Sequence, residues 1–206
     1  MMKKISIKKI AILAGVIMAL SANVFAANFA DIEGHWAEQT IVELTEAGVI
    51  NGYPDGTYKP EGTVKRSEFL KLLIVAALPE GLDISDAPSS MDHWAGQPLF
   101  VAETYRIVDP GSITKENIDE PITRREMALM IAKADLSLRR LSLNQEKSVT
   151  YNDYDEMNAQ ELKYLSHTIS EGYITGYPDN TFKPDRNMTR AEAATIIHRF
   201  TSKEGM

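Results

Sequence analysis

The sequence contains no cysteine among its 206 residues, and this absence excludes disulfide scaffolds, thiol catalysis and cysteine-type zinc sites. A basic surface is missing as well, because 22 Lys and Arg face 29 Asp and Glu, for a net charge of −7. Four of the cations are lysines in the first nine residues, and the rest of the chain has 18 basic against 29 acidic residues, or −11. An acidic chain offers few cations to displace counterions from phosphates, so we expect no nucleic-acid partner. A basic membrane-surface helix is equally disfavoured.

Signatures of catalysis and metal binding are also absent. Of the four histidines, His35 and His93 each precede a Trp, and no pair of histidines has the ligand spacing of a zincin. Residues 51–56 resemble a calcium loop only in part, because Pro54 interrupts the alternating oxygens and no Glu occupies the twelfth position. Gly-x-Ser-x-Gly and phosphate-loop patterns are missing. We therefore expect no enzyme, no metal site and no cofactor.

The N-terminus is typical of a secretory signal peptide, which we place at residues 1–26. Met1 to Lys9 is basic, Ile10 to Leu20 is apolar apart from Gly15, and a small-residue cleavage site follows. Cleavage is predicted after Ala26 or one residue later. The competing interpretation is an uncleaved membrane anchor, but the apolar run is about half of the ~20 residues that cross a bilayer. We expect a secreted chain with no stable membrane span after cleavage.

A loop of thirteen residues occurs twice. Residues 48–60 read Gly-Val-Ile-Asn-Gly-Tyr-Pro-Asp-Gly-Thr-Tyr-Lys-Pro, and residues 172–184 repeat the pattern 124 positions later. The same offset relates residues 64–68 to residues 188–192. A middle copy is marked by residues 122–126 and by Trp94, which precedes Arg124 by 30 positions, as Trp36 precedes Arg66. The register between the first two copies is therefore 58 residues, and three copies are predicted.

Each copy is predicted to form a helix, a loop and a second helix. The first helix of copy one spans about His35 to Ala47, with Trp36, Ile41, Leu44 and Ala47 roughly on one face and Gly48 as its stop. In the loops, Pro, Asp and then Gly or Asn favour a tight turn. The second helices of copies two and three begin with a Thr followed three residues later by Glu, which is a capping box. Copy one has Lys65 there, so we expect its second helix to begin less firmly, by about 1 kcal/mol.

Apolar side chains recur at helical spacing along the second helices. The three stripes are Phe69, Leu70, Leu73, Ile74 and Ala77; Met127, Met130, Ile131 and Ala134; and Ala193, Ile196, Ile197 and Phe200. A two-helix unit of this size buries too small a core alone, so we predict that the stripes meet in a shared core. The expected fold is mainly α: three helix-loop-helix repeats, at residues 28–82, 83–145 and 146–206, in one pseudo-threefold body around a central helical bundle.

The repeats resemble the S-layer homology domain family. The likeness rests on Phe29-Ala-Asp31, Trp36, residues 48–60 and residues 65–68 in copy one, and on Tyr151-Asn-Asp153, residues 172–184 and residues 189–192 in copy three. Copy two departs, because Arg106 replaces the helix-ending Gly and Asp109-Pro-Gly-Ser112 replaces Gly-Tyr-Pro-Asp. Only Trp94 and residues 123–126 clearly follow the pattern there.

This resemblance implies a non-covalent anchor in the cell wall or S-layer of a bacterium. Grooves between the three units would bind secondary cell-wall polysaccharide, commonly bearing pyruvate ketals, and other surface-layer proteins are possible partners. Planar cations suit a ketal carboxylate and aromatic faces suit sugars. The candidate carbohydrate-binding residues are Arg66, Arg124, Arg190, Trp36, Trp94, Tyr53, Tyr177, Asp55 and Asp179.

Structural interpretations of the same residues remain open. The arginines can form surface ion pairs with the Glu two positions later, the tryptophans can belong to the core, and the tyrosines and aspartates can be turn residues. A different function with the same fold is also open, namely a protein-interaction or self-assembly module of the cell surface that binds no carbohydrate.

Overall fold

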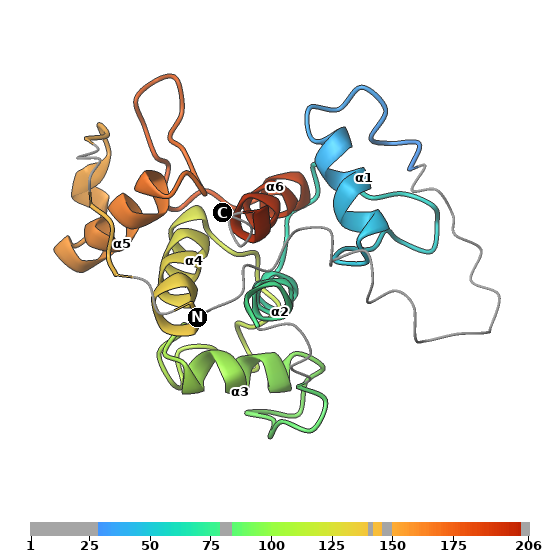
Figure 1. Ribbon diagram of the computed structural model, residues 1–206, viewed down its shortest axis with the longest axis horizontal. Coiled ribbons are helices and arrows are strands. Elements are labelled where there is room, and N and C mark those ends of the chain that lie inside the picture. Colours follow the sequence, from blue (N-terminus) through green and yellow to red (C-terminus); the bar gives the residue numbers. More distant parts are fainter. Residues whose placement is uncertain (1–28, 79–83, 140–141, 146–149, 203–206) are drawn as a thin grey trace, which may run out of the picture.

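The computed structural model describes residues 29–78, 84–139, 142–145 and 150–202, so the predicted signal peptide lies outside the described residues (Figure 1). Within these ranges the chain forms helices and no strand longer than an isolated bridge, which confirms a mainly α fold. The helices are α1 (Glu38–Glu46), α2 (Arg66–Ala77), α3 (Gly96–Thr104), α4 (Arg124–Leu138), α5 (Ala159–Ser170) and α6 (Arg190–Ser202), with a 3₁₀ turn at Tyr154–Glu156.

The helix starts follow the local sequence. In α4, the Glu126 amide donates to Thr123 Oγ1 at 3.2 Å and the Thr123 amide donates to Glu126 Oε2 at 2.8 Å, which is the predicted capping box. Thr189 and Glu192 make the same two bonds before α6. Before α2, the side chain of Lys65 has no acceptor atom for the Glu68 amide. Only the other bond of the box forms, from the Lys65 amide to Glu68 Oε2 at 2.9 Å.

The first helix of copy one is shorter than predicted. It begins at Glu38, so Trp36 precedes the helix and is 62% exposed. Ala47 is exposed too, and of the four expected face residues only Ile41 and Leu44 are buried. Gly48 has φ +70°, and its amide and that of Val49 bond back to Thr45 and Leu44, so it ends the helix as predicted.

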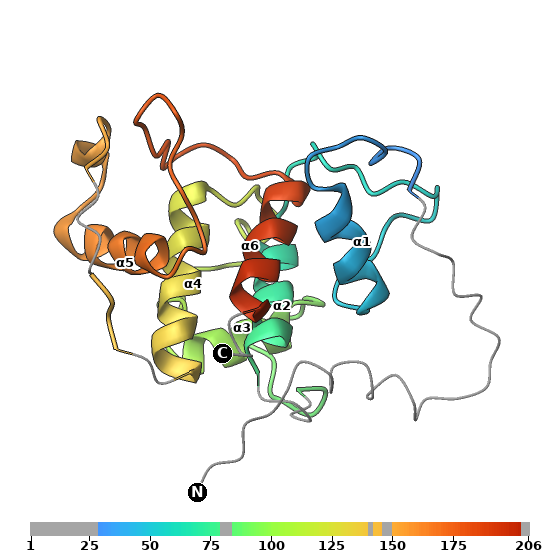
Figure 2. The same ribbon diagram turned by 45° about the horizontal axis from the view of Figure 1, so that its top comes forward.

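Each first helix packs against the second helix of another repeat. The helix α3 contacts α2, α5 contacts α4, and α1 of copy one contacts α6 of copy three. In Figures 1 and 2, α2, α4 and α6 lie in the middle of the molecule and α1, α3 and α5 lie outside them. The helix α2 also contacts both α4 and α6. The packing of the repeats is therefore cyclic, because α1 of the first repeat packs on α6 of the last repeat.

Three backbone hydrogen bonds link the repeats at corresponding positions. The amide of Val64 donates to the carbonyl of Met188, that of Ile122 to Val64, and that of Met188 to Ile122, each at 3.0 Å. Isolated antiparallel bridges flank this triangle, joining Thr63 to Thr189, Lys65 to Pro121 and Thr123 to Asn187. Every repeat thus satisfies backbone groups of the other two, which ties the three helix starts together.

The predicted apolar stripes are buried. All thirteen of their side chains are at most 6% exposed, and they belong to one cluster that extends over α2, α3, α4, α5 and α6. A second cluster joins Ile41 and Leu44 of α1 to Ala191 and Ala194 of α6. Val49 and Leu72 pack against both clusters. The core is therefore shared among the repeats, as the small size of one unit predicts.

The loop of copy one, residues 48–60, is held by the Phe-x-Asp segment that precedes its helix. The Asp31 carboxylate accepts the amides of Tyr58 at 2.9 Å and Lys59 at 2.7 Å. The Phe29 ring covers Gly52 so closely that a Cβ there would lie 2.1 Å from a ring carbon. Asp153 and Tyr151 hold the loop of copy three, residues 172–184, in the same way.

Candidate functional site

The predicted arginines of copies two and three each reach into the loop of another repeat. Arg190 Nε donates to the carbonyl of Tyr58 at 2.9 Å, and its Nη2 donates to that of Asn51 at 3.1 Å. Arg124 makes the corresponding bonds, from Nε to Phe182 at 2.8 Å and from Nη2 to Thr175. The sequence resemblance suggested grooves between units, and the structure assigns these two arginines to loops outside their own copy.

Arg66 has different partners, because the loop of copy two has a different sequence. Its Nε donates to Glu126 Oε1 at 2.8 Å, and its Nη1 donates to Glu120 Oε2 at 2.9 Å and to the carbonyl of Asn117 at 2.9 Å. Partial burial lowers the pKa of Arg66, but the hydrogen bonds to Glu126 and Glu120 outweigh it and raise the pKa overall. Two carboxylates therefore already pair with this guanidinium. We call the group formed by Arg66, Asn117, Glu120 and Glu126 the Arg66 corner.

The predicted tyrosines lie against these cations. Tyr53 has Lys59 Nζ 4.2 Å and the Arg190 guanidinium 4.8 Å from its ring centroid. Tyr177 has Lys183 at 4.4 Å and Arg124 at 4.9 Å. Such contacts stabilise the loop and the crossing arginine together. They also occupy ring faces that a sugar would need.

The predicted aspartates build the turns. Asp55 Oδ1 accepts the amide of Thr57 at 3.1 Å and its hydroxyl at 2.6 Å, and these bonds lower the pKa of Asp55 to about 2. Asp179 makes the same pair of bonds with Thr181, which lowers its pKa. This geometry is an Asx turn, so both residues shape the loops directly.

The tryptophans are surface residues. Trp36 is 62% and Trp94 is 55% exposed, and each stands just before a first helix. They do not belong to the core, which resolves the alternative left open by the sequence. Copy three has Gln160 at the corresponding position, 124 residues after Trp36.

Residues from all three repeats meet in a groove beside Trp94. This hollow has a volume of about 290 Å³, and we call it the Trp94 groove; the side chains that matter below are Asn51, Glu68, Lys71, Val75, Trp94 and Arg190. Lys71 Nζ lies 5.9 Å from the Trp94 ring centroid, and Arg190 Nη1 is 4.0 Å from Glu68 Oε1. Two cations against one carboxylate make this groove locally positive in an acidic chain.

Sequence reasoning missed Lys71. It is an exposed residue of α2, within the apolar run that follows Glu68. Its sequence signal is that it is a single cation within an apolar run. A helix face that packs in the core does not require a charge at such a position.

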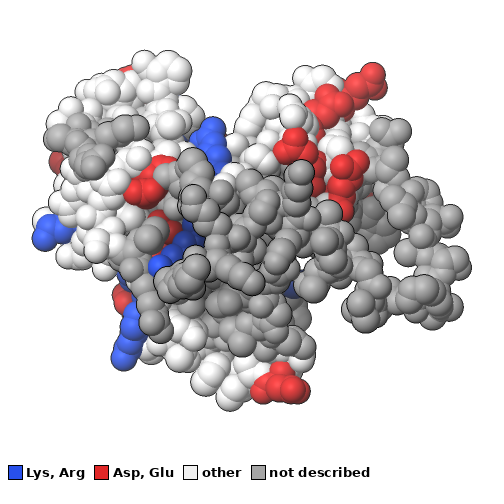
Figure 3. All heavy atoms as spheres, in the orientation of Figure 1, with Lys and Arg blue, Asp and Glu red and all other residues white. Residues whose placement is uncertain are grey.

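A second hollow, of about 500 Å³, lies along α1, and we call it the Trp36 hollow; its walls are His35, Trp36, Glu38, Gln39, Val42 and Glu43. Glu43 pairs with His198 of α6 at 2.9 Å, so this face of α1 adjoins the helix on which α1 packs. Figure 3 shows a cleft between the lobe of α1, where acidic side chains gather, and the lobe formed by α5 and the loop that follows it.

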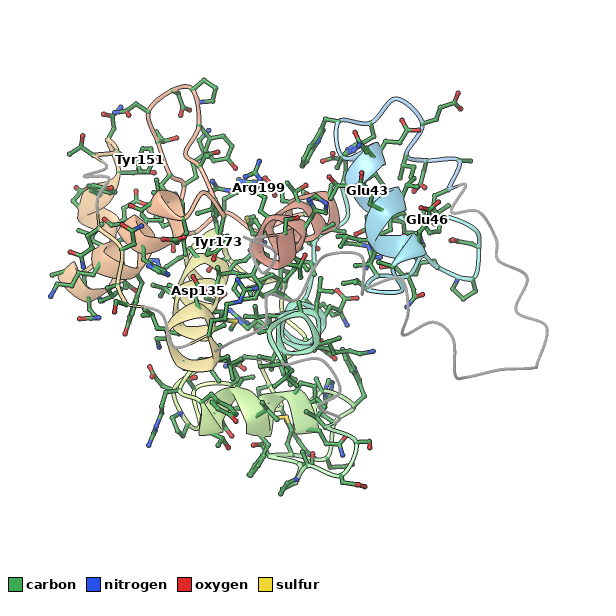
Figure 4. All side chains as sticks on the ribbon, in the orientation of Figure 1. Glu43, Glu46, Asp135, Tyr151, Tyr173 and Arg199 are labelled. Atoms are coloured by element: carbon green, nitrogen blue, oxygen red, sulfur yellow. The ribbon has the colours of Figure 1, made fainter. Side chains whose placement is uncertain are left out.

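A buried polar cluster joins α4 to the end of α5. Asp135 Oδ2 accepts the hydroxyl of Tyr173 at 2.9 Å and lies 3.0 Å from His167 Nε2 (Figure 4). His167 Nδ1 accepts the amide of Asn144 at 2.9 Å. The side chains of Asp135 and His167 are fully buried, so this cluster has no access for a substrate and acts in packing.

The described residues contain no group of three or more His, Asp or Glu side chains placed to hold a metal ion. Among the same residues, no helix has the length and apolar character needed to cross a membrane.

Comparison with known proteins agrees with this organisation. The model of the S-layer homology domain matches residues 28–70 and 150–194, which lie in copies one and three. The cellulosome-anchoring protein of Acetivibrio thermocellus is 30% identical over 161 residues, covering 74% of this chain and 35% of that protein. S-layer protein EA1 of Bacillus anthracis is 28% identical over 201 residues, covering 95% of this chain and 22% of that protein.

An amylopullulanase of Thermoanaerobacterium thermosulfurigenes is 29% identical over 181 residues, covering 86% of this chain and 10% of the enzyme. The chain thus spans between a tenth and about a third of the length of these relatives. The two stretches of this chain that match the family model contain its two similar loops and the starts of α2 and α6. On this basis the chain belongs to the S-layer homology domain family.

Proposed function

We propose that the chain is a non-covalent anchor at the bacterial cell surface, which binds an anionic secondary cell-wall polysaccharide. The observation that carries the proposal is the Trp94 groove, where Arg190, Lys71 and the exposed ring of Trp94 meet from three repeats. The names of the relatives support the location, since they include a cellulosome-anchoring protein and an S-layer protein. The amylopullulanase matches over only 10% of its length, so its activity is not carried over to this chain.

The chemistry of the groove suits an acidic sugar. The exposed face of Trp94 offers an apolar platform for a pyranose ring. Arg190 is oriented by the carbonyls of Tyr58 and Asn51, which leaves Nη1, 4.0 Å from Glu68, to approach a ligand carboxylate. Lys71, whose Nζ lies 5.9 Å from the Trp94 ring centroid, adds a second cation to the lining. A sugar that bears a pyruvate ketal presents the required carboxylate beside an apolar face.

The three places where repeats meet are not equivalent. Arg190 and Arg124 lie on the two loops that keep the Gly-Tyr-Pro-Asp pattern, and Trp94 and Trp36 stand beside the two hollows. The Arg66 corner has the divergent loop and two carboxylates on its guanidinium, and copy three has Gln160 at the sequence position of the Trp. Pairing each arginine with the loop of its own copy would favour Arg66 over Arg124 as a ligand contact. The bonds from Arg124 to the loop of copy three support the opposite order.

The proposal is tested with purified cell walls, before and after chemical extraction of the non-peptidoglycan polymer. The protein should sediment with intact walls, and excess free polymer should release it. Lys71→Gln and Trp94→Ala should each weaken binding about tenfold, in the range of a lost charged hydrogen bond or a lost aromatic contact.

The matched controls are Lys115→Gln and Tyr105→Ala, an exposed cation and an exposed aromatic outside both hollows. These variants should bind as the unchanged protein does. Equal retention on extracted walls would overturn carbohydrate binding and favour the alternative, a protein-interaction or self-assembly module. Competition by a pyruvylated saccharide, but not by its unmodified counterpart, would identify the ketal as the recognised group.

A further inference from the structure

Each of the two tryptophans of the chain follows a histidine, and the two pairs have the same geometry. The rings of His35 and Trp36 have centroids 5.3 Å apart and planes inclined by 36°. For His93 and Trp94 the values are 5.4 Å and 38°. A geometry that recurs in two copies of a repeat calls for a common cause.

Both ring nitrogens of each histidine have partners. His35 Nδ1 accepts the amide of Ala37 at 3.1 Å, and its Nε2 lies 2.8 Å from Glu61 Oε1. His93 Nδ1 accepts the amide of Ala95 at 3.1 Å, and its Nε2 lies 3.4 Å from Asp119 Oδ2. An amide can donate only to an unprotonated nitrogen, so Nδ1 is bare and the hydrogen is on Nε2, facing the carboxylate. Both rings are therefore neutral and have one defined tautomer.

The bond from Ala37 to His35 spans Trp36, and the bond from Ala95 to His93 spans Trp94. The backbone on the other side is held too, because the carbonyl of His35 accepts the amide of Glu38 at 2.9 Å, and that of His93 accepts the amide of Gly96 at 2.8 Å. In copy three the positions 124 residues after His35 and Trp36 are Ala159 and Gln160, so that copy has neither the histidine nor the tryptophan. The histidine acceptor thus occurs in the two copies that have a Trp and is absent from the copy that lacks one.

We propose that His35 and His93 are positioning residues for the two tryptophans, and that protonation of their rings releases Trp36 and Trp94. This inference rests on the proposed function, in which the tryptophans contact sugar. A proton on Nδ1 turns an acceptor into a donor that points at another donor, so the bond across the tryptophan must open. Histidine is the side chain whose charge ordinarily changes between pH 5 and pH 8, so acidification within this range is the condition to test.

The charged groups that face the two rings are few. Glu61, from the segment before α2, faces His35, and Glu38 binds the amide of Gly34 beside it. Asp119 faces His93 and is itself close to Lys65, at 3.7 Å. Asp92 precedes His93 and pairs with Lys115 at 3.8 Å. The carboxylates bond to Nε2 in both protonation states, so only the Nδ1 contact changes sign.

The consequence is that the affinity of the chain for the wall polysaccharide falls when the pH is lowered. Loss of one neutral hydrogen bond that orders the tryptophan should weaken binding about two- to tenfold at each hollow.

The experiment follows tryptophan fluorescence and the backbone amide resonances of Ala37 and Ala95 from pH 8 to pH 5, without ligand. Both should change as the pH falls through the range in which histidine gains a proton. His35→Asn should remove the response of Trp36 and Ala37 only, and His93→Asn that of Trp94 and Ala95 only, because Asn keeps an acceptor but does not titrate in this range. The control His198→Asn, whose ring pairs with Glu43, should keep both responses.

Polysaccharide binding is then measured at pH 8 and pH 5 with the unchanged protein and the double variant. The unchanged protein should bind more weakly at pH 5, and the double variant should lose this pH dependence. A flat fluorescence and amide titration, or one that persists in the double variant, overturns the inference, as does a pH dependence of binding that the double variant retains. Normal titration with no polysaccharide binding at any pH instead overturns the proposed function and leaves the positioning of the tryptophans intact.

Discussion

Arg190 Nε donates a hydrogen bond to the carbonyl oxygen of Tyr58, 2.9 Å away and 132 residues earlier in the chain. The residue expected to hold a ligand therefore also joins the last helix of the fold to the first loop. Arg124 does the same between copies two and three, and it is only 5% exposed. At these two positions we therefore expect a substitution to lower stability together with any binding.

The first prediction concerns these arginines. Arg124→Lys should cost about 1–3 kcal/mol of unfolding free energy, because a lysine cannot reach both carbonyls and one buried acceptor loses its charged donor. Arg190→Lys should behave similarly, and both should weaken polysaccharide binding. Arg66→Lys should leave polysaccharide affinity within twofold, since two carboxylates occupy that guanidinium. Urea unfolding and calorimetric titration of the three variants at one salt concentration check this; an equal affinity loss in all three would contradict the assignment.

A second prediction follows from the left-handed backbone of Arg106. It has φ +58° at the position where copies one and three have Gly, whose φ is +70° at Gly48 and +75° at Gly172. A left-handed residue with a side chain costs about 1–2 kcal/mol, and glycine regains most of this despite its greater entropy in the unfolded chain. Arg106→Gly should therefore raise the unfolding free energy by about 0.5–1 kcal/mol. The converse control, Gly48→Ala, should lower it, although open space surrounds that position.

The buried cluster gives a third prediction. Burial and the neighbouring Asp135 raise the pKa of Tyr173, so its hydroxyl stays protonated and donates to that carboxylate. Tyr173→Phe removes one donor from a buried charge and should cost about 1.5–3 kcal/mol. Tyr164→Phe, at a half-buried tyrosine of α5 outside this cluster, is the control and should change stability little. Chemical denaturation measures both; an unchanged midpoint for Tyr173→Phe would show that Asp135 does not depend on this bond.

The fourth prediction is a pH dependence of the loops. Hydrogen bonds from Thr57 lower the pKa of Asp55 to about 2, against an ordinary value near 3.9. A lowered pKa means that the bonds favour the folded loop above about pH 4 and are lost as the pH falls towards 2. The amide resonance of Thr57 should therefore follow a transition in this range, and Asp55→Asn should abolish it. A Thr57 amide that does not respond between pH 4 and pH 2 would remove Asp55 as its partner.

The fifth prediction concerns the shared core. A chain that ends after residue 145 lacks α6, so Ile41 and Leu44 of α1 lose the helix on which they pack. The amides of α1 should then exchange hydrogen as an unfolded segment does. Protection of α1 in the shortened chain, measured by native-state exchange, would show that copy one folds without copy three.

Much of the fold could be predicted from local sequence. Thr123 and Thr189 fixed two helix starts, Gly48 marked a helix end, and the apolar stripes identified the buried faces. The pairing of repeats could not be predicted, because contacts such as Arg190 to Tyr58 depend on which unit lies beside which, and nothing in one repeat encodes its neighbour. The tryptophans were also predicted on a helical face. In the structure, the amide of the residue after each Trp donates to the preceding histidine, and the helix begins after the Trp, which is exposed. The pseudo-threefold character and the domain limits at residues 82 and 145 stay predictions.

The packing of α1 on α6 also sets the order of events when the chain folds. The helix α1 emerges early in synthesis, yet the partner that buries Ile41 and Leu44 is made about 150 residues later. Until then no cyclic set of hydrogen bonds among Val64, Ile122 and Met188 can close. Contacts so distant in sequence are slow to form and favour a single late step. With this topology, α1 has no helix to pack on until the last helix of the chain is available.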